Sequence, residues 1–304
     1  MSKIAFIYPG QASQYVGMGK DLYENFEIAK SLYNQANDIL GFSITDVSFN
    51  GPEDALKQTK VTQPAIFVHS IIVNHLLVEK GIQPQAVGGH SLGEYSALVA
   101  AGAIDFEAAL KLVQRRGELM QEAGEISPGT MAAIVGLDAD AVDAVCAEAL
   151  ATGIVQPANY NSSQQIAISG SVAGVEKAME LASAKGAKRV IPLVVSGAFH
   201  SPLMKHAQTG LKSQLDATQV EKANIPVYTN VKALPETSPD EIKSLLFQQL
   251  TAPVRWTELI VNMISDGVTH FYEVGPGNVL TGLIKRIDRN VPCTPIGTVE
   301  QINN

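Results

Sequence analysis

The sequence predicts an α/β protein with a parallel sheet and a small βαββαβ unit inserted into the chain. The run Ile4–Tyr8 is almost continuously apolar and ends at Pro9-Gly10, as is typical of a buried parallel strand. A short apolar segment at 85–89 is followed by Ser91 and by helix formers at 92–101, which indicates strand, turn and helix. Between residues 130 and 195 the expected elements follow the order βαββαβ, the signature of a ferredoxin-like unit.

The composition permits a large buried core and excludes several classes of function. Of the 304 residues, 46% are hydrophobic and only 17% are charged, so a globular protein of one or two domains is expected. The formal net charge of −8 has the wrong sign for a general binder of nucleic acid. Cys146 and Cys293 lie far apart without a CxxC spacing, which indicates neither a disulfide framework nor a thiolate metal cage.

No targeting segment is recognised in the sequence, which favours the cytoplasm. The first apolar run stops at Pro9, which is too short for the core of a signal peptide. No stretch is expected to reach the roughly 18 apolar residues of a membrane-spanning helix. Two cysteines without a pairing pattern fit a reducing compartment. We therefore expect a cytoplasmic protein without a membrane partner.

The elements of the large layer are expected on both sides of the inserted unit. Apolar positions from Pro64 to Val78 recur at helical spacing and Gly81 supplies a stop, so this segment is predicted to be a core helix. Ser238 before Pro239 has the chemistry of a capped helix start, and 234–240 is the most linker-like segment. The other predicted elements of this layer are a helix at 107–120, a strand at 226–230, a helix at 239–250 and a strand at 270–274.

The inserted unit is predicted to form a small sheet that can cover one side of a cleft. Its expected elements are strands at 131–137, 154–158, 165–170 and 188–195 and helices at 138–150 and 173–184. We therefore predict a large subdomain of residues 1–126 and 197–304 and a small ferredoxin-like subdomain of residues 127–196.

Ser91 is the candidate nucleophile. Residues 89–93 read Gly-His-Ser-Leu-Gly and match the pattern G-x-S-x-G, with the expected strand before and helix after. A sharp turn of this kind holds the serine in a strained conformation, and small neighbours let its hydroxyl project at the N-terminus of a helix. The alternative is that the pentapeptide occurs by chance.

His200 is the candidate base for Ser91. It follows the last strand of the inserted unit, where the chain returns to the large layer, although a solvated loop histidine is the alternative. His206 lies in a predicted helix, and its spacing from His200 is no common zinc spacing, so no metal site is expected. The other histidines are assigned to a core helix (His69, His75), to the serine turn (His90) and to a strand (His270).

No acidic residue between Ser91 and His200 stands out as a third member of a triad, because the intervening acids fall mainly in predicted helices. The last carbonyl groups of a helix lack partners and carry partial negative charge, so they can orient a histidine instead. Gln248 and Gln249 end the predicted helix at 239–250, and ordinary helix-end glutamines are the alternative.

Arg116 is the candidate anion-binding residue. It falls on the apolar stripe of the predicted helix at 107–120, whereas Arg115 falls beside Lys111 and Glu118. The planar guanidinium binds a carboxylate through two parallel hydrogen bonds, and a buried ion pair with a protein acid is the alternative. Ser91 and Arg116 together indicate acyl chemistry on a substrate that carries a free carboxylate.

Several segments in the right order give the chain a resemblance to a known family. They are residues 6–14, 89–97, 114–117, 159–162, 197–202 and 273–277. On these segments the chain resembles the malonyl-CoA:acyl carrier protein transacylases of type II fatty acid biosynthesis, nearly from end to end. The resemblance implies a hydrolase-like large subdomain, acyl carrier protein S-malonyltransferase activity, a CoA thioester substrate, acyl carrier protein as partner, and no cofactor.

The resemblance also implies a role for each site residue. Ser91 attacks the thioester, His200 serves as its general base and acid, and Arg116 binds the malonyl carboxylate. Main-chain groups complete the implied site: the N–H groups of Gln11 and Leu92 form the oxyanion hole, and the carbonyl of Gln249 orients His200. The stretch Ala198-Phe199-His200 is similar to the malonyl-selective form of the family.

The implied reaction is a ping-pong transfer through a malonyl-serine intermediate in an enzyme expected to be a monomer. One alternative is a freestanding acyltransferase that loads a polyketide synthase carrier protein with the same residues. A serine thioesterase is compatible with G-x-S-x-G alone, and a non-catalytic binding protein is disfavoured because every site position is occupied. Two basic clusters are candidates for docking an acidic carrier protein: Lys285, Arg286 and Arg289, or Lys188 and Arg189.

Overall fold

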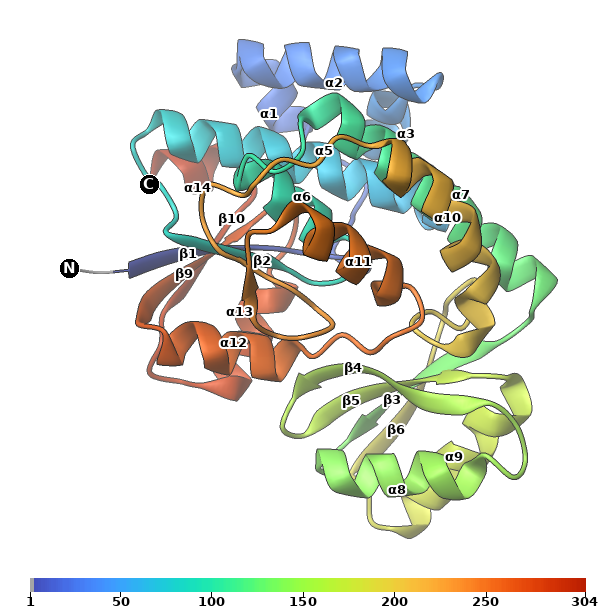
Figure 1. Ribbon diagram of the computed structural model, residues 1–304. Coiled ribbons are helices and arrows are strands. Elements are labelled where there is room, and N and C mark those ends of the chain that lie inside the picture. Colours follow the sequence, from blue (N-terminus) through green and yellow to red (C-terminus); the bar gives the residue numbers. More distant parts are fainter. Residues whose placement is uncertain (1–2) are drawn as a thin grey trace.

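The chain forms two separate sheets, as the computed structural model of residues 3–304 shows (Figure 1). The larger sheet has the strand order β10-β9-β1-β2-β7-β8 and is parallel except for β8. Its strands are β1 (Lys3–Tyr8), β2 (Ala86–Gly89), β7 (Val227–Tyr228), β8 (Pro235–Glu236), β9 (Val268–Val274) and β10 (Cys293–Ile296). The predicted α/β fold class is confirmed.

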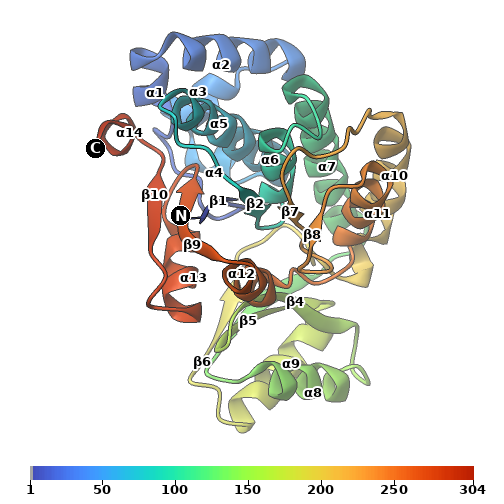
Figure 2. The same cartoon turned by 60° about the vertical axis from the view of Figure 1, so that its left-hand side comes forward.

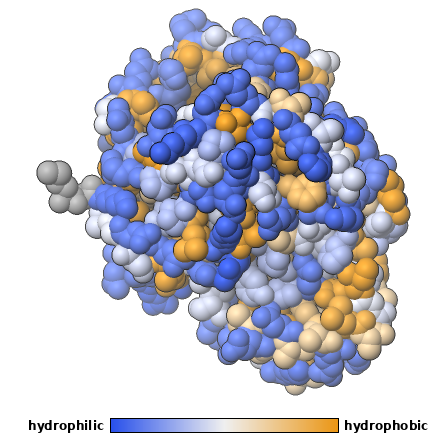
Figure 3. All heavy atoms as spheres, in the orientation of Figure 1, coloured by the Kyte–Doolittle hydropathy of each residue, from blue (hydrophilic) through white to orange (hydrophobic). Residues whose placement is uncertain are grey.

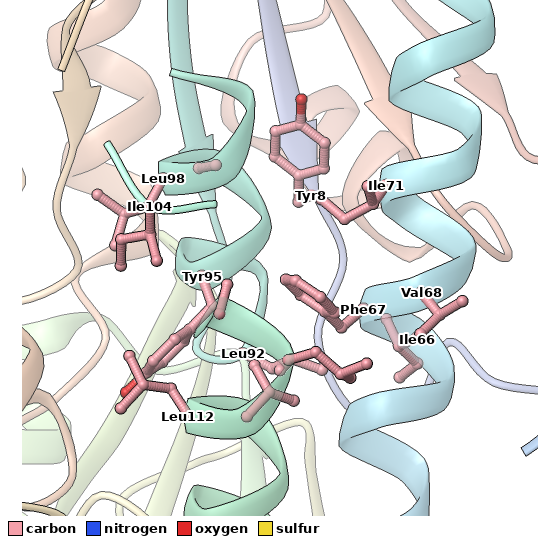
Figure 4. Packing of buried hydrophobic residues seen from close by; sticks show 14 of the residues in the cluster. Tyr8, Ile66, Phe67, Val68, Ile71, Leu92, Tyr95, Leu98, Ile104 and Leu112 are labelled. Atoms are coloured by element: carbon pink, nitrogen blue, oxygen red, sulfur yellow. The ribbon is translucent and has the colours of Figure 1, made fainter. Parts of the chain in front are cut away.

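Helices cover both faces of the larger sheet. Along β1, Phe6 and Tyr8 belong to one apolar core while Ala5 and Ile7 belong to another, as expected for a strand buried on both sides. The first core includes residues of α5 (Thr59–Glu79), α6 (Gly93–Ala100) and α7 (Phe106–Ile126). Figure 4 shows side chains of α5, α6 and β1 in this core, with Phe67 between the strand and α6. The second core contains α12 (Trp256–Ser265) and α13 (Val279–Ile287).

The remaining helices lie around this sheet. The first helices of the chain gather at one end of the molecule, and α10 and α11 lie together beside α7 (Figures 1 and 2). These elements are α1 (Lys20–Asn25), α2 (Glu27–Leu40), α3 (Ile44–Asn50), α4 (Glu53–Leu56), the 3-10 turn η1 (Pro202–Met204), α10 (Lys205–Ala217), α11 (Pro239–Gln249) and α14 (Val299–Asn303). The helices between residues 20 and 56 are not among those predicted.

Helix α5 corrects two predictions. It begins at Thr59 and carries Pro64 within its first turns, whereas the predicted helix begins at Pro64. The sequence predicts no segment that is long and apolar enough to cross a membrane. By length and composition α5 could cross one, and it is the one such helix within residues 3–304. In the structure 78% of its most apolar window is buried, because a helix that is apolar all round can pack inside a protein core.

The second sheet lies between α7 and α10 in the chain and has a core of its own. Its strand order is β4-β5-β3-β6 with antiparallel neighbours, and α8 and α9 cover one face. Its elements are β3 (Thr130–Val135), α8 (Ala139–Ala149), β4 (Val155–Ser162), β5 (Gln165–Gly170), α9 (Val172–Ala184) and β6 (Arg189–Leu193). The predicted βαββαβ order is confirmed, while the subdomain boundaries at 126/127 and 196/197 stay a prediction.

The segment 234–240 differs from its prediction in two ways. It is not a linker, because Pro235 and Glu236 form β8 and pair with β7. Ser238 is the N-cap residue of α11, but its side chain accepts no capping hydrogen bond. The carboxylate of Glu236 instead accepts the backbone N–H groups of Thr237 and Ser238, and this bends the chain into the helix.

The face seen in Figure 3 is mostly hydrophilic. Small apolar areas interrupt it, and they are most continuous over the smaller sheet unit. Exposed apolar side chains of that unit include Leu150, Ile154, Val172 and Val194.

Candidate active site

Ser91 lies at the turn between β2 and α6, in the left-handed region of backbone conformation with a φ of 53°. The two glycines of the turn are required by space. A Cβ on Gly89 would lie 1.9 Å from the carbonyl carbon of Gly93, and one on Gly93 would lie 2.0 Å from the carbonyl oxygen of Tyr8. The predicted strand–turn–helix around Ser91 is therefore present, with the tight packing that G-x-S-x-G needs.

Two amide side chains hold the backbone of Ser91. Asn230 Oδ1 accepts the Ser91 N–H at 2.7 Å, and Gln249 Nε2 donates to the Ser91 carbonyl oxygen at 3.0 Å. Both residues also bind one oxygen of Glu94: the Asn230 backbone N–H lies 3.1 Å and Gln249 Nε2 lies 2.8 Å from Glu94 Oε2. The left-handed turn is thus held by contacts from three elements of the chain.

His200 meets the Ser91 hydroxyl. Its Nε2 lies 2.8 Å from Ser91 Oγ, and its Nδ1 lies 2.9 Å from the main-chain carbonyl oxygen of Gln249. A carbonyl oxygen only accepts, so Nδ1 carries the ring proton and Nε2 is the nitrogen that can accept the proton of Ser91. Burial, together with the nearby charge of Arg116, lowers the pKa of His200 to about 3. The imidazole is therefore neutral at pH 7 and available as a base.

Arg116 is buried beside the same hydroxyl, as its place on the apolar stripe predicts. Its guanidinium donates to Ser91 Oγ at 3.0 Å, to Gln63 Oε1 at 2.7 Å and to Gln249 Oε1 at 2.8 Å. All three partners are neutral, so Arg116 is not hydrogen-bonded to a protein acid, which was the alternative that the sequence left open. Arg115 instead points outward and binds Glu118 at 3.0 Å.

The loop after β1 packs against the serine turn. A Cβ on Gly10 would lie 2.5 Å from the His90 carbonyl oxygen, so the backbone preceding Gln11 touches the residue preceding Ser91. Within residues 3–304 no acceptor takes the backbone N–H of Gln11 or of Leu92. Two unengaged N–H groups on adjoining loops are the kind of donors that an oxyanion hole uses.

Four polar residues of the site have no place among the sequence predictions: Gln63, Glu94, Asn230 and Gln156. Gln63 lies one residue before the predicted start of its helix, and Asn230 closes a predicted strand. Gln156 of β4 donates to the carbonyl oxygens of His200 at 2.8 Å and Thr251 at 3.1 Å. Only Glu94 carried a signal, because it lies inside the segment 89–97 that the family resemblance quotes.

The other candidates lie outside this cluster. His206 is half-exposed, and its Nε2 lies 3.7 Å from a Glu122 carboxylate oxygen. The Gln248 side chain donates to Ser244 Oγ at 3.0 Å, so of the two helix-end glutamines only Gln249 reaches the site. In the part of the chain that the structure describes, no three His, Cys, Asp or Glu side chains are grouped to hold a metal ion.

A parallel sheet that presents a serine on a tight strand–turn–helix, in contact with a neutral histidine, defines the class of α/β enzymes that pass acyl groups through a serine. The chain belongs to the acyl transferase domain family, whose sequence model matches residues 5–300.

Relatives and solved structures are similar to this chain over nearly its whole length. The malonyl CoA-acyl carrier protein transacylase of Bacillus subtilis (strain 168) is 48% identical over 99% of this chain and 96% of its own length. The acyl carrier protein S-malonyltransferase of Vibrio cholerae superposes with a TM-score of 0.96 at 42% identity, covering 99% of both chains. A malonyl-transacylase solved with a type II PKS acyl-carrier protein has a TM-score of 0.96 at 40% identity, covering 99% of this chain and 98% of its own.

Proposed function

We propose that this protein transfers the malonyl group of malonyl-CoA to the phosphopantetheine thiol of acyl carrier protein, and so supplies malonyl-acyl carrier protein for fatty acid biosynthesis. One observation carries the proposal: Ser91 Oγ lies within hydrogen-bonding distance of both His200 Nε2 and Arg116 Nη2. A nucleophile, a base and a carboxylate-binding cation therefore meet at one oxygen. The names of the relatives support the same reaction.

In the first half-reaction Ser91 Oγ attacks the thioester carbonyl of malonyl-CoA, and His200 Nε2 takes the hydroxyl proton. The Gln249 carbonyl accepts the Nδ1–H at 2.9 Å, which keeps the ring in the required tautomer and stabilises the imidazolium. The tetrahedral intermediate then expels the CoA sulfur, which receives the proton from His200. The product is a malonyl ester of Ser91 and free CoA thiol.

The negative oxygen of the tetrahedral intermediate is bound by the backbone N–H groups of Gln11 and Leu92. Each such donor is typically worth about 2.7–4 kcal/mol of transition-state stabilisation. The close packing of the Gly10 loop on the serine turn supports this assignment, since it holds the two N–H groups without the use of flexible side chains.

In the second half-reaction the phosphopantetheine thiol of the carrier protein attacks the malonyl ester. His200 Nε2 takes the thiol proton and returns it to Ser91 Oγ as the ester bond breaks. The two thioesters are nearly equal in energy, so the enzyme has to exclude water from the ester rather than drive the transfer.

Arg116 selects the acyl group in this proposal. Its guanidinium lies directly against the nucleophile, with Nη2 only 3.0 Å from Ser91 Oγ. An acyl group whose carboxylate binds Arg116 must therefore be short, and malonyl has a single methylene between its carboxylate and its thioester carbon. Acyl groups without a carboxylate would leave the Arg116 charge with neutral partners only, as in the free protein, and so would not gain the ion pair that malonyl gains.

The same residues would serve a transferase that loads a polyketide synthase carrier, and one structural relative was solved with a type II PKS carrier protein. This is the second candidate function. Parallel assays with the two kinds of carrier protein separate the candidates, because the acylation of Ser91 is common to both and only the acceptor differs.

We also propose that the enzyme works in the cytoplasm and needs no metal or organic cofactor. The two half-reactions use only a hydroxyl, an imidazole, a guanidinium and backbone N–H groups of this chain. Malonyl-CoA and the carrier protein supply the remaining atoms as substrates.

The test is intact-protein mass spectrometry after mixing the protein with malonyl-CoA, followed by addition of carrier protein or of buffer alone. A malonyl adduct that persists in buffer and is discharged by carrier protein is expected. Adduct loss at the same rate in buffer would identify a hydrolase and refute the transferase. Carrier protein lacking phosphopantetheine is the matched control, because it docks without offering a thiol.

A further inference from the structure

We propose that Glu94 is a positioning residue for acyl transfer: its buried carboxylate accepts hydrogen bonds from Asn230 and Gln249, which hold the Ser91 backbone and, through the Gln249 main-chain carbonyl, the His200 ring. The inference rests on the proposed function for its meaning, since positioning matters only if Ser91 and His200 react. Glu94 does not touch Ser91 Oγ or the His200 ring, so it acts through Asn230 and Gln249.

A single oxygen of Glu94 accepts hydrogen bonds from both Asn230 and Gln249. Glu94 Oε2 accepts the Asn230 backbone N–H at 3.1 Å and Gln249 Nε2 at 2.8 Å, and the carboxylate is only 2% exposed. The amides also approach each other, with Gln249 Nε2 at 3.4 Å from Asn230 Oδ1. Glu94 is thus the shared acceptor of a network that reaches both polar backbone atoms of Ser91.

The network fixes the side chains whose rotation would disturb the chemistry. Asn230 Nδ2 donates to the Gly89 carbonyl oxygen at 2.6 Å while Oδ1 accepts the Ser91 N–H, so Asn230 spans the serine turn. The amide of Gln249 donates through Nε2 to Glu94 and accepts from Arg116 through Oε1. An acceptor at Glu94 therefore dictates which way the Gln249 amide is turned.

The orientation of Gln249 matters because this residue contacts three parts of the site. Its main-chain oxygen binds His200 Nδ1, its Oε1 binds Arg116 Nη2, and its Nε2 binds the Ser91 carbonyl. Without the Glu94 acceptor, Nε2 loses its charged partner, and only the bonds to Arg116 and to the Ser91 carbonyl still orient the amide. The Ser91 turn, which has a φ of 53°, is then held by two residues that are themselves fixed by fewer bonds.

The carboxylate of Glu94 is costly to bury, and its donors offset part of that cost. Burial raises the pKa of Glu94 to about 7, while the bonds from Gln249 and Asn230 and the charge of Arg116 act in the opposite direction. A buried polar pair can be replaced as a whole by well-packed apolar side chains, whereas removal of one partner leaves the other unsatisfied. At this position an apolar side chain would leave two buried N–H donors unpaired.

The experiment measures the second-order rate constant for labelling of Ser91 by a fluorophosphonate, divided by the fraction of protein that can be labelled. The reagent reacts with an activated serine and needs neither malonyl-CoA nor carrier protein. E94A is expected to lower this rate constant on the order of 10- to 100-fold, the cost of a small misplacement of reacting groups. E94Q keeps an oxygen acceptor and is expected to stay within about threefold of the unaltered protein.

The matched control is E273Q. Glu273 is also fully buried and also accepts backbone N–H groups, those of Leu280 at 2.9 Å and Thr281 at 2.7 Å at the start of α13. This variant is expected to melt at lower temperature with an unchanged rate constant per labelled site. If E94A does not fold, E94D is measured instead, because it keeps the charge and withdraws the acceptor oxygen by one methylene.

An unchanged rate constant in the folded E94A or E94D protein would overturn the proposal, and so would an E94Q protein as slow as E94A. Failure of the proposed function is a separate result. It appears as an unaltered protein whose Ser91 is labelled by the fluorophosphonate but not by malonyl-CoA, and it leaves the comparison of Glu94 variants intact.

Discussion

The two sheets of this protein bury different chemistry. At the ends of the parallel strands β2 and β7 the large unit buries Glu94, Arg116, His200 and Gln249. The core of the antiparallel sheet consists of aliphatic side chains and Cys146. Parallel strands followed by helix N-termini place polar groups from distant segments at one edge, whereas an antiparallel sheet packed on two helices offers only one apolar face.

The smaller sheet still contacts the site through its edge strand β4. Gln156 donates to the carbonyl oxygen of His200 at 2.8 Å, and Asn161 Oδ1 lies 2.8 Å from His90 Nε2. Both contacts support residues beside the reacting groups rather than the groups themselves. The small unit therefore supports the site without supplying a reacting group. The comparison predicts that substitutions in the large unit change the reaction, whereas substitutions in the core of the small unit change stability.

The largest expected effect is that of S91A. Removal of the hydroxyl eliminates the nucleophile, so no covalent malonyl adduct should form, while the small loss of volume leaves the fold intact. Mass spectrometry after incubation with malonyl-CoA checks this result, and the thermal unfolding curve serves as the control. An adduct retained by S91A would place the nucleophile elsewhere.

R116A is expected to have the next largest effect. Loss of the buried guanidinium should lower malonyl transfer on the order of 100- to 1,000-fold, because a charge-assisted bond to a buried carboxylate is worth about 2–5 kcal/mol. Transfer of an uncharged acetyl group should fall less. Parallel assays with malonyl-CoA and acetyl-CoA measure the ratio, with outward-facing R115A as the matched control. Equal losses for the two acyl groups would show a structural role.

I168A tests the small unit. Ile168 is fully buried in β5, so its truncation should lower the free energy of unfolding by about 2–4 kcal/mol. The malonylation rate per active site should remain close to that of the unaltered protein, because the residue lies in the core that holds no reacting group. Chemical denaturation and an active-site titration give the two numbers. A large fall in rate at unchanged active fraction would contradict the division of labour.

Acidification should lower the stability of the large unit and leave that of the small unit unchanged. Burial lowers the pKa of His200 to about 3 and that of His69 to about 4, from 6.5 in the unfolded chain. The unfolded state therefore binds more protons below pH 6.5, and these groups stabilise the fold above that pH and lose this contribution as the pH falls. Glu94 opposes this trend, because its pKa is raised to about 7.

Residues 127–196 contain no histidine, so the loss of stability should be confined to the large unit. Hydrogen exchange at pH 7.5 and pH 5 measures protection in each sheet. H69L should weaken the pH dependence by about 2 kcal/mol at pH 5, because it removes the proton uptake that His69 contributes on unfolding. Equal loss of protection in both sheets would contradict this prediction.

The smallest expected effect is on carrier docking. Lys285 and Arg286 lie in the last turn of α13, and Arg286 donates to Gln165 of the small sheet, so this cluster adjoins both units. Reversal of the charges of Lys285, Arg286 and Arg289 should raise the KM for carrier protein a few-fold and leave acylation by malonyl-CoA unchanged. The same reversal at Lys188 and Arg189 tests the other cluster. A cluster whose reversal leaves the KM unchanged is not part of the docking surface.

Local pattern was sufficient for much of the fold. Three patterns can be recognised in the chain because each spans only a few neighbouring residues. They are the alternation of buried faces along β1, the glycines around Ser91 and the apolar stripe that turns Arg116 inward. The errors also have local causes. Pro64 lies in the second turn of α5, inside the helix, where proline is ordinarily disfavoured, and the sequence therefore predicts the helix to begin there. The turn before α11 is built by Glu236 rather than by the predicted serine.

By itself the sequence determined the order of the elements in the small unit, the serine turn and which arginine faces inward, because each depends on neighbours within one turn or one strand. Only the tertiary structure decided how the polar site is closed. Gln63, Asn230 and Gln156 come from three distant segments, and nothing in their own surroundings distinguishes them from other amides. A buried donor must find its acceptor in space, and the fold alone brings Glu94, Gln249 and Ser91 within reach of one another.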